Sequence, residues 1–228
     1  MLTRHLLALG LQPGKITDAP VRLDGSRILG QMTPVAYVLL AVLFVMLTAS
    51  LFVGALKIMQ LTRLVREQRQ FREHADAAAR AGMLQTSAEN RREPGARVLQ
   101  RLVERVERGP VGTEELKGIA QQAIVDEERR ANALVSVLTA VAATGPLLGL
   151  LGTVWGIIES FMAIDQVKSS AIGVIAPAMA GALLTTALGL TAAIPALIAV
   201  QFADRRIGEL STELEAAAQT WIGVLLQK

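Results

Sequence analysis

The sequence predicts an all-α membrane protein with three transmembrane helices that extend into a cytoplasmic helical bundle. Hydrophobic residues make up 52% of the 228 residues, and charged residues only 19%. Three stretches lack Asp, Glu, Lys, Arg and His altogether, namely residues 28–56, 131–158 and 169–203. A membrane-spanning helix needs about 20 mostly apolar residues, so each stretch is long enough. These stretches exclude an ordinary soluble enzyme, and also a porin-like barrel, whose strands alternate in polarity and run about 10 residues.

The composition provides little for a metal, cofactor or nucleic-acid site. The chain has no cysteine, and its two histidines, His5 and His74, stand far apart in sequence. Aromatic residues amount to 4%, which is few for a surface that stacks nucleic-acid bases. The net charge of +3 is explained by basic loops beside a membrane. We therefore expect no metal, no cofactor, no nucleic acid and no enzyme activity, since the spans contain no nucleophile–base pair.

We expect the chain to divide into seven segments. They are an N-terminal periplasmic segment at 1–33, transmembrane helices at 34–57, 132–158 and 171–200, a cytoplasmic helical domain at 58–131, a periplasmic connection at 159–170 and a cytoplasmic C-terminal helix at 201–228. Pro34 suits the start of the first helix, where a missing N–H costs least.

The distribution of basic residues predicts the orientation. Cytoplasmic loops of membrane proteins are rich in Lys and Arg. Residues 57–130 contain 15 Lys and Arg, and Arg205 and Arg206 follow the third span, whereas the connection 159–170 has only Lys168. Arg22 and Arg27 in the N-terminal segment oppose this assignment but are outnumbered. The long segment and the tail should therefore face the cytoplasm, with the N-terminus outside.

The cytoplasmic segments look helical. Apolar residues recur at helical spacing in RVLQRLVERVER at 97–108, and again from Ile207 to Leu225. Thr113, followed by Glu114 and Glu115, resembles a helix start. We expect one long helix from there into the second span, and the first helix to continue to about residue 90. The apolar stripes predict a cytoplasmic bundle; helices lying on the membrane surface are the alternative.

The second and third spans carry stripes of small residues. Gly145, Gly149, Gly152 and Gly156 recur at steps of four, three and four. A similar stripe follows in the third span at Ala178, Ala182, Thr185, Gly189 and Ala192. Small residues let helices approach closely in lipid, where no hydrophobic force drives them together. The stripes indicate close contacts between helices, either within one subunit or between subunits. We infer an oligomer, because one subunit hardly needs two such faces.

The same two spans contain prolines and hydroxyls but no acid at mid-depth. Pro146, Pro177 and Pro195 each remove a backbone donor, and the hydroxyls of Thr144, Thr153, Thr185, Thr186 and Thr191 stand near them. A proton relay needs a group that titrates. If this protein conducts protons, the central carboxylate must therefore come from a partner.

Two strings in these spans resemble a known family. GPLLGLLGTVWGIIESF at 145–161 and IAPAMAGALLTTALGLTAAIPALIA at 175–199 are similar to the signature of the MotA/TolQ/ExbB proton-channel family, and most similar to its ExbB and TolQ branch. The resemblance implies a homopentamer in the inner membrane of Gram-negative bacteria. Its second and third spans would surround a dimer of ExbD-like or TolR-like single-span subunits, whose transmembrane aspartate carries the proton.

The resemblance also implies roles for particular residues. Thr153 and Thr186 match the family's pore threonines, and Thr185 stands beside them. Pro146 and Pro177 match its helix-shaping prolines, and we expect Pro195 to shape its helix in the same way. The small-residue spacing, and not the resemblance, predicts that Gly149, Gly152, Gly156 and Gly189 pack against a neighbouring helix. ExbB and TolQ commonly carry a glutamate where this chain has Gly181. Glu159 stands where relatives often have histidine, and it either helps protons enter from outside or is an ordinary hydrated carboxylate.

Two functions remain open at this point. The first is a motor subunit that converts proton-motive force into mechanical work for outer-membrane uptake, envelope integrity or gliding motility, acting on a TonB-like, TolA-like or motility partner. The second is a non-conducting membrane scaffold, which Gly181 in place of the glutamate favours. The resemblance implies that the transported ion is H⁺, and the sequence leaves Na⁺ open as the alternative.

Overall fold

The computed structural model describes residues 33–80, 83–89, 91–167 and 172–227, which consist of helices joined by short loops. Its elements are α3 (Pro34–Arg80), the short 3₁₀ helix η1 (Gln85–Ala88), α4 (Pro94–Glu107), α5 (Thr113–Asn132), α6 (Val135–Val167) and α7 (Ile172–Leu225). No strand occurs in the described residues. The prediction of an all-α fold is confirmed. Apart from Thr33, the predicted N-terminal segment lies outside the part of the chain that is described.

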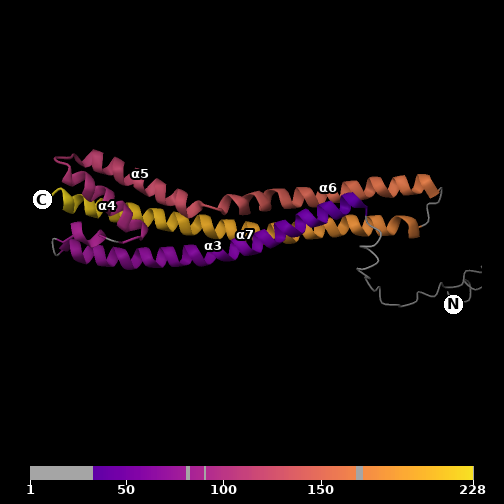
Figure 1. Ribbon diagram of the computed structural model, residues 1–228, viewed down its shortest axis with the longest axis horizontal. Coiled ribbons are helices and arrows are strands. Elements are labelled where there is room, and N and C mark those ends of the chain that lie inside the picture. The colour runs from indigo at the N-terminus through magenta and orange to yellow at the C-terminus, as the bar shows by residue number, and fades with distance from the viewer. Residues whose placement is uncertain (1–32, 81–82, 90, 168–171, 228) are drawn as a thin grey trace, which may run out of the picture.

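The helices form one elongated bundle. Figure 1 shows α3 and α7 running along most of its length, while α5 and α6 follow each other along one side. The short helix α4 lies at the end that holds the C-terminus. Three helices are long and apolar enough to cross a membrane, at Pro34–Arg80, Val135–Ile164 and Ile175–Leu225. Each of these helices is longer than the roughly 20 residues that a bilayer requires. Both α3 and α7 continue beyond the apolar half of the bundle into the half that contains α4 and α5, here called the polar half.

The polar half contains the main core. Its largest buried side chains include Trp221 and Phe71, whose rings meet edge to face with centroids 6.0 Å apart. The apolar stripe of α4 is buried at Val98, Leu99 and Leu102. Burial inside the chain is what a helical bundle requires, because a helix lying on a membrane would leave this stripe to the lipid.

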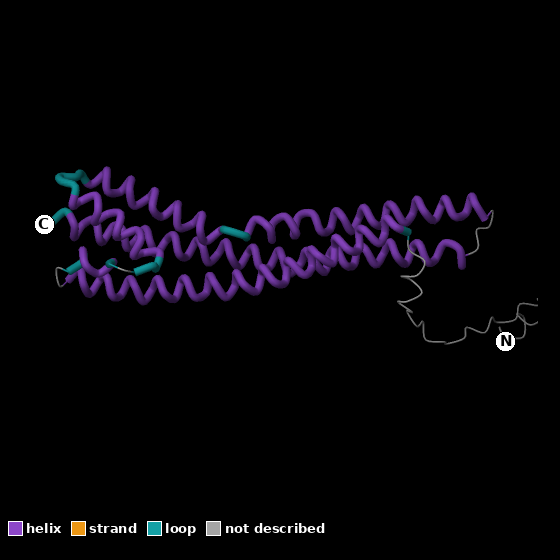
Figure 2. The backbone as a smooth tube through the Cα atoms, in the orientation of Figure 1, coloured by secondary structure: helices purple, strands orange, loops and turns teal. Residues whose placement is uncertain are grey.

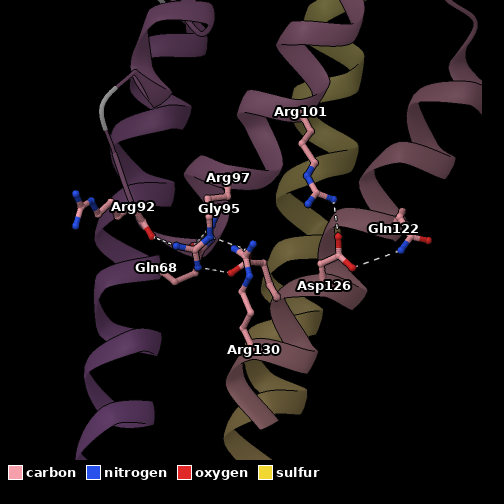
Figure 3. Close-up of polar contacts among 9 residues, drawn as sticks. Gln68, Arg92, Gly95, Arg97, Arg101, Gln122, Asp126 and Arg130 are labelled. Carbon is pink, nitrogen blue, oxygen red and sulfur yellow. Dashed lines mark hydrogen bonds and ion pairs between the residues drawn. The ribbon is translucent and has the colours of Figure 1, made fainter. Parts of the chain in front are cut away.

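Ion pairs and a close glycine contact join the helices of this half. The buried Glu127 carboxylate of α5 accepts hydrogen bonds from Arg97 of α4, at 2.7 Å from Nε, and from Arg130, at 2.9 Å. The Gly95 N–H donates to Gln68 Oε1 of α3 over 2.7 Å. Figure 3 shows Gln68 and Gly95, the arginines Arg97 and Arg130, and the Arg101–Asp126 pair. A Cβ at position 95 would lie 2.6 Å from Gln68 Nε2 and 2.9 Å from Phe71 Cδ1, so any other residue there requires these buried side chains to shift.

Two predicted helix extents are wrong. The first helix ends at Arg80 rather than near residue 90. The long helix expected from Thr113 into the second span is interrupted between Asn132 and Val135, where Figure 2 shows a short loop. Leu134 adopts the left-handed region there, with φ of 68°. Neither Ala133 nor Leu134 at this break is glycine or proline. The only local signals of a helix end here are Arg129 and Arg130 in the last turn of α5 and Asn132 at its end.

Candidate ion pathway along α6 and α7

The glycines of α6 lie against the small residues of α7. A Cβ on Gly152 would come within 2.1 Å of Thr185 Oγ1, and one on Gly156 within 2.4 Å of the Cβ of Ala182. Real side chains essentially never approach so closely, so this contact tolerates no added atom without a shift. As residue numbers rise along α6, the contacted numbers fall along α7, so the two helices are antiparallel.

The same contact continues toward the break. A Cβ on Gly189 would lie 2.5 Å from the carbonyl oxygen of Gly145, and one on Gly149 would lie 2.9 Å from the Cα of Thr186. The two small-residue stripes therefore pack against each other within one chain. This arrangement removes our argument that the stripes themselves require an oligomer, since a single copy already uses both faces.

Four of the five threonines named above bond to their own helix. Thr153 Oγ1 donates to the Leu150 carbonyl over 2.7 Å, and Thr185 Oγ1, almost fully buried, donates to the Ala182 carbonyl over 2.7 Å. Thr144 and Thr191 do the same with the residues four positions before them. Thr186 differs, because its hydroxyl crosses to α6 and donates to the Gly149 carbonyl over 2.8 Å.

Thr153 and Thr186 lie on the same flank of the α6–α7 pair. An α-helix turns by roughly 100° per residue, which places Thr153 to one side of the line through Gly149, Gly152 and Gly156. Thr186 is likewise displaced to one side of the line through Ala182, Thr185 and Gly189 of α7. Because the two helices are antiparallel, both threonines are displaced toward the same side of the pair, in agreement with the hydrogen bond from Thr186 to Gly149. Both threonines are half-buried in the single chain.

Gly181 and Glu159 lie on the opposite flank, which α3 covers. Gly181 lines a small hollow together with Ala36 and Leu39 of α3 and Trp155 of α6. Glu159 accepts a hydrogen bond from the hydroxyl of Thr33, directly before α3. The structure therefore does not bring Gly181 and Glu159 together with the two threonines.

The three prolines each remove one backbone hydrogen bond without ending the helix that contains them. Pro146 lies inside α6, and Pro177 and Pro195 lie inside α7. Each proline leaves the carbonyl four residues earlier without its usual helical donor. In hydrocarbon such a carbonyl needs another partner, such as a hydroxyl, a neighbouring helix or water. This places polar backbone atoms within otherwise apolar helices.

The sequence does not predict two polar contacts, one between Thr33 and Glu159 and one between Lys57 and Ala131. Thr33 belongs to the predicted N-terminal segment, for which the sequence suggests no role, but in the structure its hydroxyl donates a hydrogen bond to Glu159, 126 positions away. Its position before Pro34 is typical of a helix start and is a local signal, but no local signal reveals the distant partner. Lys57 marks the end of the first span and counts toward the orientation in the sequence analysis, but in the structure it is 3% exposed and donates to the Ala131 carbonyl.

The chemistry available at the site is limited. No cluster of three or more His, Cys, Asp or Glu side chains occurs in the described residues. Between the ends of the spans, the described residues of α6 and α7 provide hydroxyls and carbonyl oxygens, which form hydrogen bonds but do not titrate near neutral pH. The hydroxyl and carbonyl oxygens of the site can therefore form hydrogen bonds with a polar group placed against this flank.

Comparisons with known proteins identify the family and several relatives of this chain. The model of the MotA/TolQ/ExbB proton channel family matches residues 90–216. The biopolymer transport protein ExbB of Salmonella typhimurium is 40% identical over 116 residues, covering 47% of this chain and 48% of that protein. The Tol-Pal system protein TolQ of Pseudomonas aeruginosa is 44% identical over 87 residues, covering 37% of this chain and 38% of that protein. The chain thus spans about half the length or less of these curated relatives.

Proposed function

Because the chain belongs to the MotA/TolQ/ExbB proton channel family, in its ExbB/TolQ branch, we propose that it forms the channel of an inner-membrane motor driven by protons. Five copies surround a dimer of ExbD-like or TolR-like single-span proteins, which supply the transmembrane aspartate. The N-terminus lies in the periplasm and the C-terminus in the cytoplasm. The energised task is outer-membrane uptake, envelope integrity or surface motility, according to the partner.

One observation carries this proposal: Thr153 and Thr186 stand on a single flank of a helix pair that is otherwise apolar there. A charged carboxylate is costly in such surroundings, and hydroxyls lower that cost by hydrogen bonding. Protonation of the partner aspartate makes it neutral and lets it move past the apolar wall. One charge crossing 100 mV releases about 2.3 kcal/mol, so a few protons per cycle suffice to shift a packed interface between two arrangements.

The test is proton uptake by liposomes that contain this chain and its acidic partner. Thr153→Val with Thr186→Val keeps the side-chain shape and removes both hydroxyls. We expect proton flux to fall about tenfold or more, equivalent to about 1.4 kcal/mol in the barrier. Thr153→Ser with Thr186→Ser should restore most of it. Thr144→Val is the matched control, because Thr144 is exposed and its hydroxyl bonds within α6. Unchanged flux in the double valine variant would contradict the proposed role.

The transported ion and the competing function are tested in the same liposomes. Replacing sodium by choline should leave the flux unchanged if the ion is H⁺. The competing candidate is a non-conducting scaffold, which Gly181 favours because glycine cannot take part in proton transfer. An uncoupler should abolish the work done by a motor and leave a scaffold unaffected.

A further inference from the structure

Lys57 is a buried lysine at the boundary between the two halves of the bundle. It is 3% exposed, and its Nζ donates to the Ala131 carbonyl of α5 over 3.1 Å. None of the ion pairs found among the described residues includes it. Burying an ammonium ion is costly unless something compensates its charge. A lysine that meets a carbonyl instead of a carboxylate therefore needs an explanation.

The carbonyl that Lys57 contacts lies at the end of α5. The last carbonyls of a helix lack helical donors and carry the negative end of the helix dipole. In a continuous helix, Ala131 would instead accept the N–H of Val135, four residues later. At this junction Ala133 donates to Arg130 over 3.3 Å, and Val137 donates to Leu134 over 3.2 Å. The ammonium ion thus occupies the place that a helical N–H would otherwise take.

The backbone at the break is unfavourable by itself. Leu134 has φ of 68°, a region in which a side chain with a Cβ is strained. Its side chain is 54% exposed, so burial of the leucine does not compensate for this strain. Without a tertiary contact, residues 131–135 would gain hydrogen bonds and lose strain by forming one helix.

We propose that the Lys57 ammonium ion holds α5 and α6 apart as two helices, by capping the end of α5. The break then determines how α6, with its glycine face and Thr153, is turned relative to the polar half of the bundle. Lys57 is a positioning residue in this account, because it acts on α6 through the α5–α6 junction. The inference concerns this junction alone and does not depend on the proposed proton flux.

Hydrogen exchange of the full chain in lipid nanodiscs tests the proposal. In the broken form, Leu134 lies in the break and Val135 and Ser136 begin α6, so their amides lack helical acceptors and exchange quickly. In a fused helix the same three amides donate to carbonyls of α5 and exchange slowly. Lys57→Met keeps the apolar stem and removes the charge. We expect it to slow exchange at these three amides about tenfold or more. Equal exchange in Lys57→Met and the unaltered chain, with the rest of the bundle protected, would overturn the proposal.

Two further variants separate this role from a loss of packing. Adding Leu134→Gly to Lys57→Met should restore fast exchange, because glycine adopts a positive φ without strain. If exchange stays slow in this double variant, the proposal that Lys57 keeps α5 and α6 apart against the strain at Leu134 is wrong. Leu134→Ala alone should keep fast exchange, because Lys57 is intact. If Leu134→Ala by itself fuses the helices, the lysine does not hold the break. This last measurement stays informative even if Lys57→Met does not fold.

Discussion

The two halves of the bundle are held together by different kinds of contact. In the apolar half, α6 and α7 meet through glycine, alanine and threonine, with backbone lying against backbone. In the polar half, the contacts involve large side chains such as Trp221 and Phe71, surrounded by ion pairs such as Arg101–Asp126. Water drives large apolar side chains together, whereas lipid does not, so helices in lipid rely on close fit. The two halves should therefore respond differently to the same kind of substitution.

The largest expected effect is in the polar half. Trp221 is fully buried against Phe71, so Trp221→Ala should lower the free energy of unfolding by about 3–5 kcal/mol. The other tryptophan, Trp155, is 38% exposed in α6 and is the matched control. Trp155→Ala should cost clearly less. Thermal unfolding in detergent micelles measures both; equal losses would mean that burial does not distinguish the two halves.

An added methyl group should have opposite effects in the two halves. Gly156→Ala places a Cβ 2.4 Å from the Cβ of Ala182 and should destabilise the protein by about 1–3 kcal/mol. Gly208→Ala meets nothing within 4 Å in α7 and should stabilise the protein by about 0.5–1 kcal/mol, since alanine favours a helix.

Exchanging the residues at positions 156 and 182 tests whether a clash with Ala182 causes the loss of stability expected for Gly156→Ala. Gly156→Ala combined with Ala182→Gly moves the methyl group from α7 to α6 and should recover most of the lost stability. A double variant as unstable as Gly156→Ala alone would show that the clash with Ala182 is not responsible. Unfolding of the purified chain, followed by circular dichroism, is sufficient for this comparison.

The smallest expected effect is a response to acid that is confined to the polar half. A hydrogen bond from Arg101 lowers the pKa of Asp126, and one from Arg206 lowers the pKa of Glu209. Carboxylates with lowered pKa values stabilise the folded state above their unfolded pKa values, near pH 4. This stabilisation is lost as the pH falls through the folded values. Acid should therefore loosen the polar half before the spans.

The two tryptophans report on the two halves separately. With Trp155→Phe, the remaining Trp221 fluorescence should shift to the red as the pH falls below about 4. With Trp221→Phe, the Trp155 signal should stay constant over the same range. Asp126→Asn should reduce the pH response of Trp221. A response of Trp155 that precedes that of Trp221 would contradict this assignment.

Much of the fold is predictable because the relevant signals are local. The absence of charges in three long stretches predicts three spans, and the stripe of α4 predicts its buried face. The start of α3 at Pro34 and the interruption before α5 at 109–112 follow from proline and glycine. The spacing of four glycines predicts one face of α6, and the structure places that face against α7.

The site is less predictable because it combines residues from distant parts of the chain. Thr153 and Thr186 are conspicuous in the sequence, but only the antiparallel packing of α6 and α7 places them on one flank. The same packing separates them from Gly181, which lies in the hollow beneath α3. The resemblance to a family named these residues together, without showing that they occupy two flanks.

The sequence by itself determined which segments are apolar enough to leave water and which helix faces are small or large, because these properties depend on composition and period alone. The tertiary structure decided where a helix without glycine or proline at the break is interrupted, and which flank each polar residue occupies. The physical reason is that these features depend on contacts such as Lys57 with Ala131, formed by residues 74 positions apart. The break itself contains neither glycine nor proline, and the charge of a distant lysine favours it.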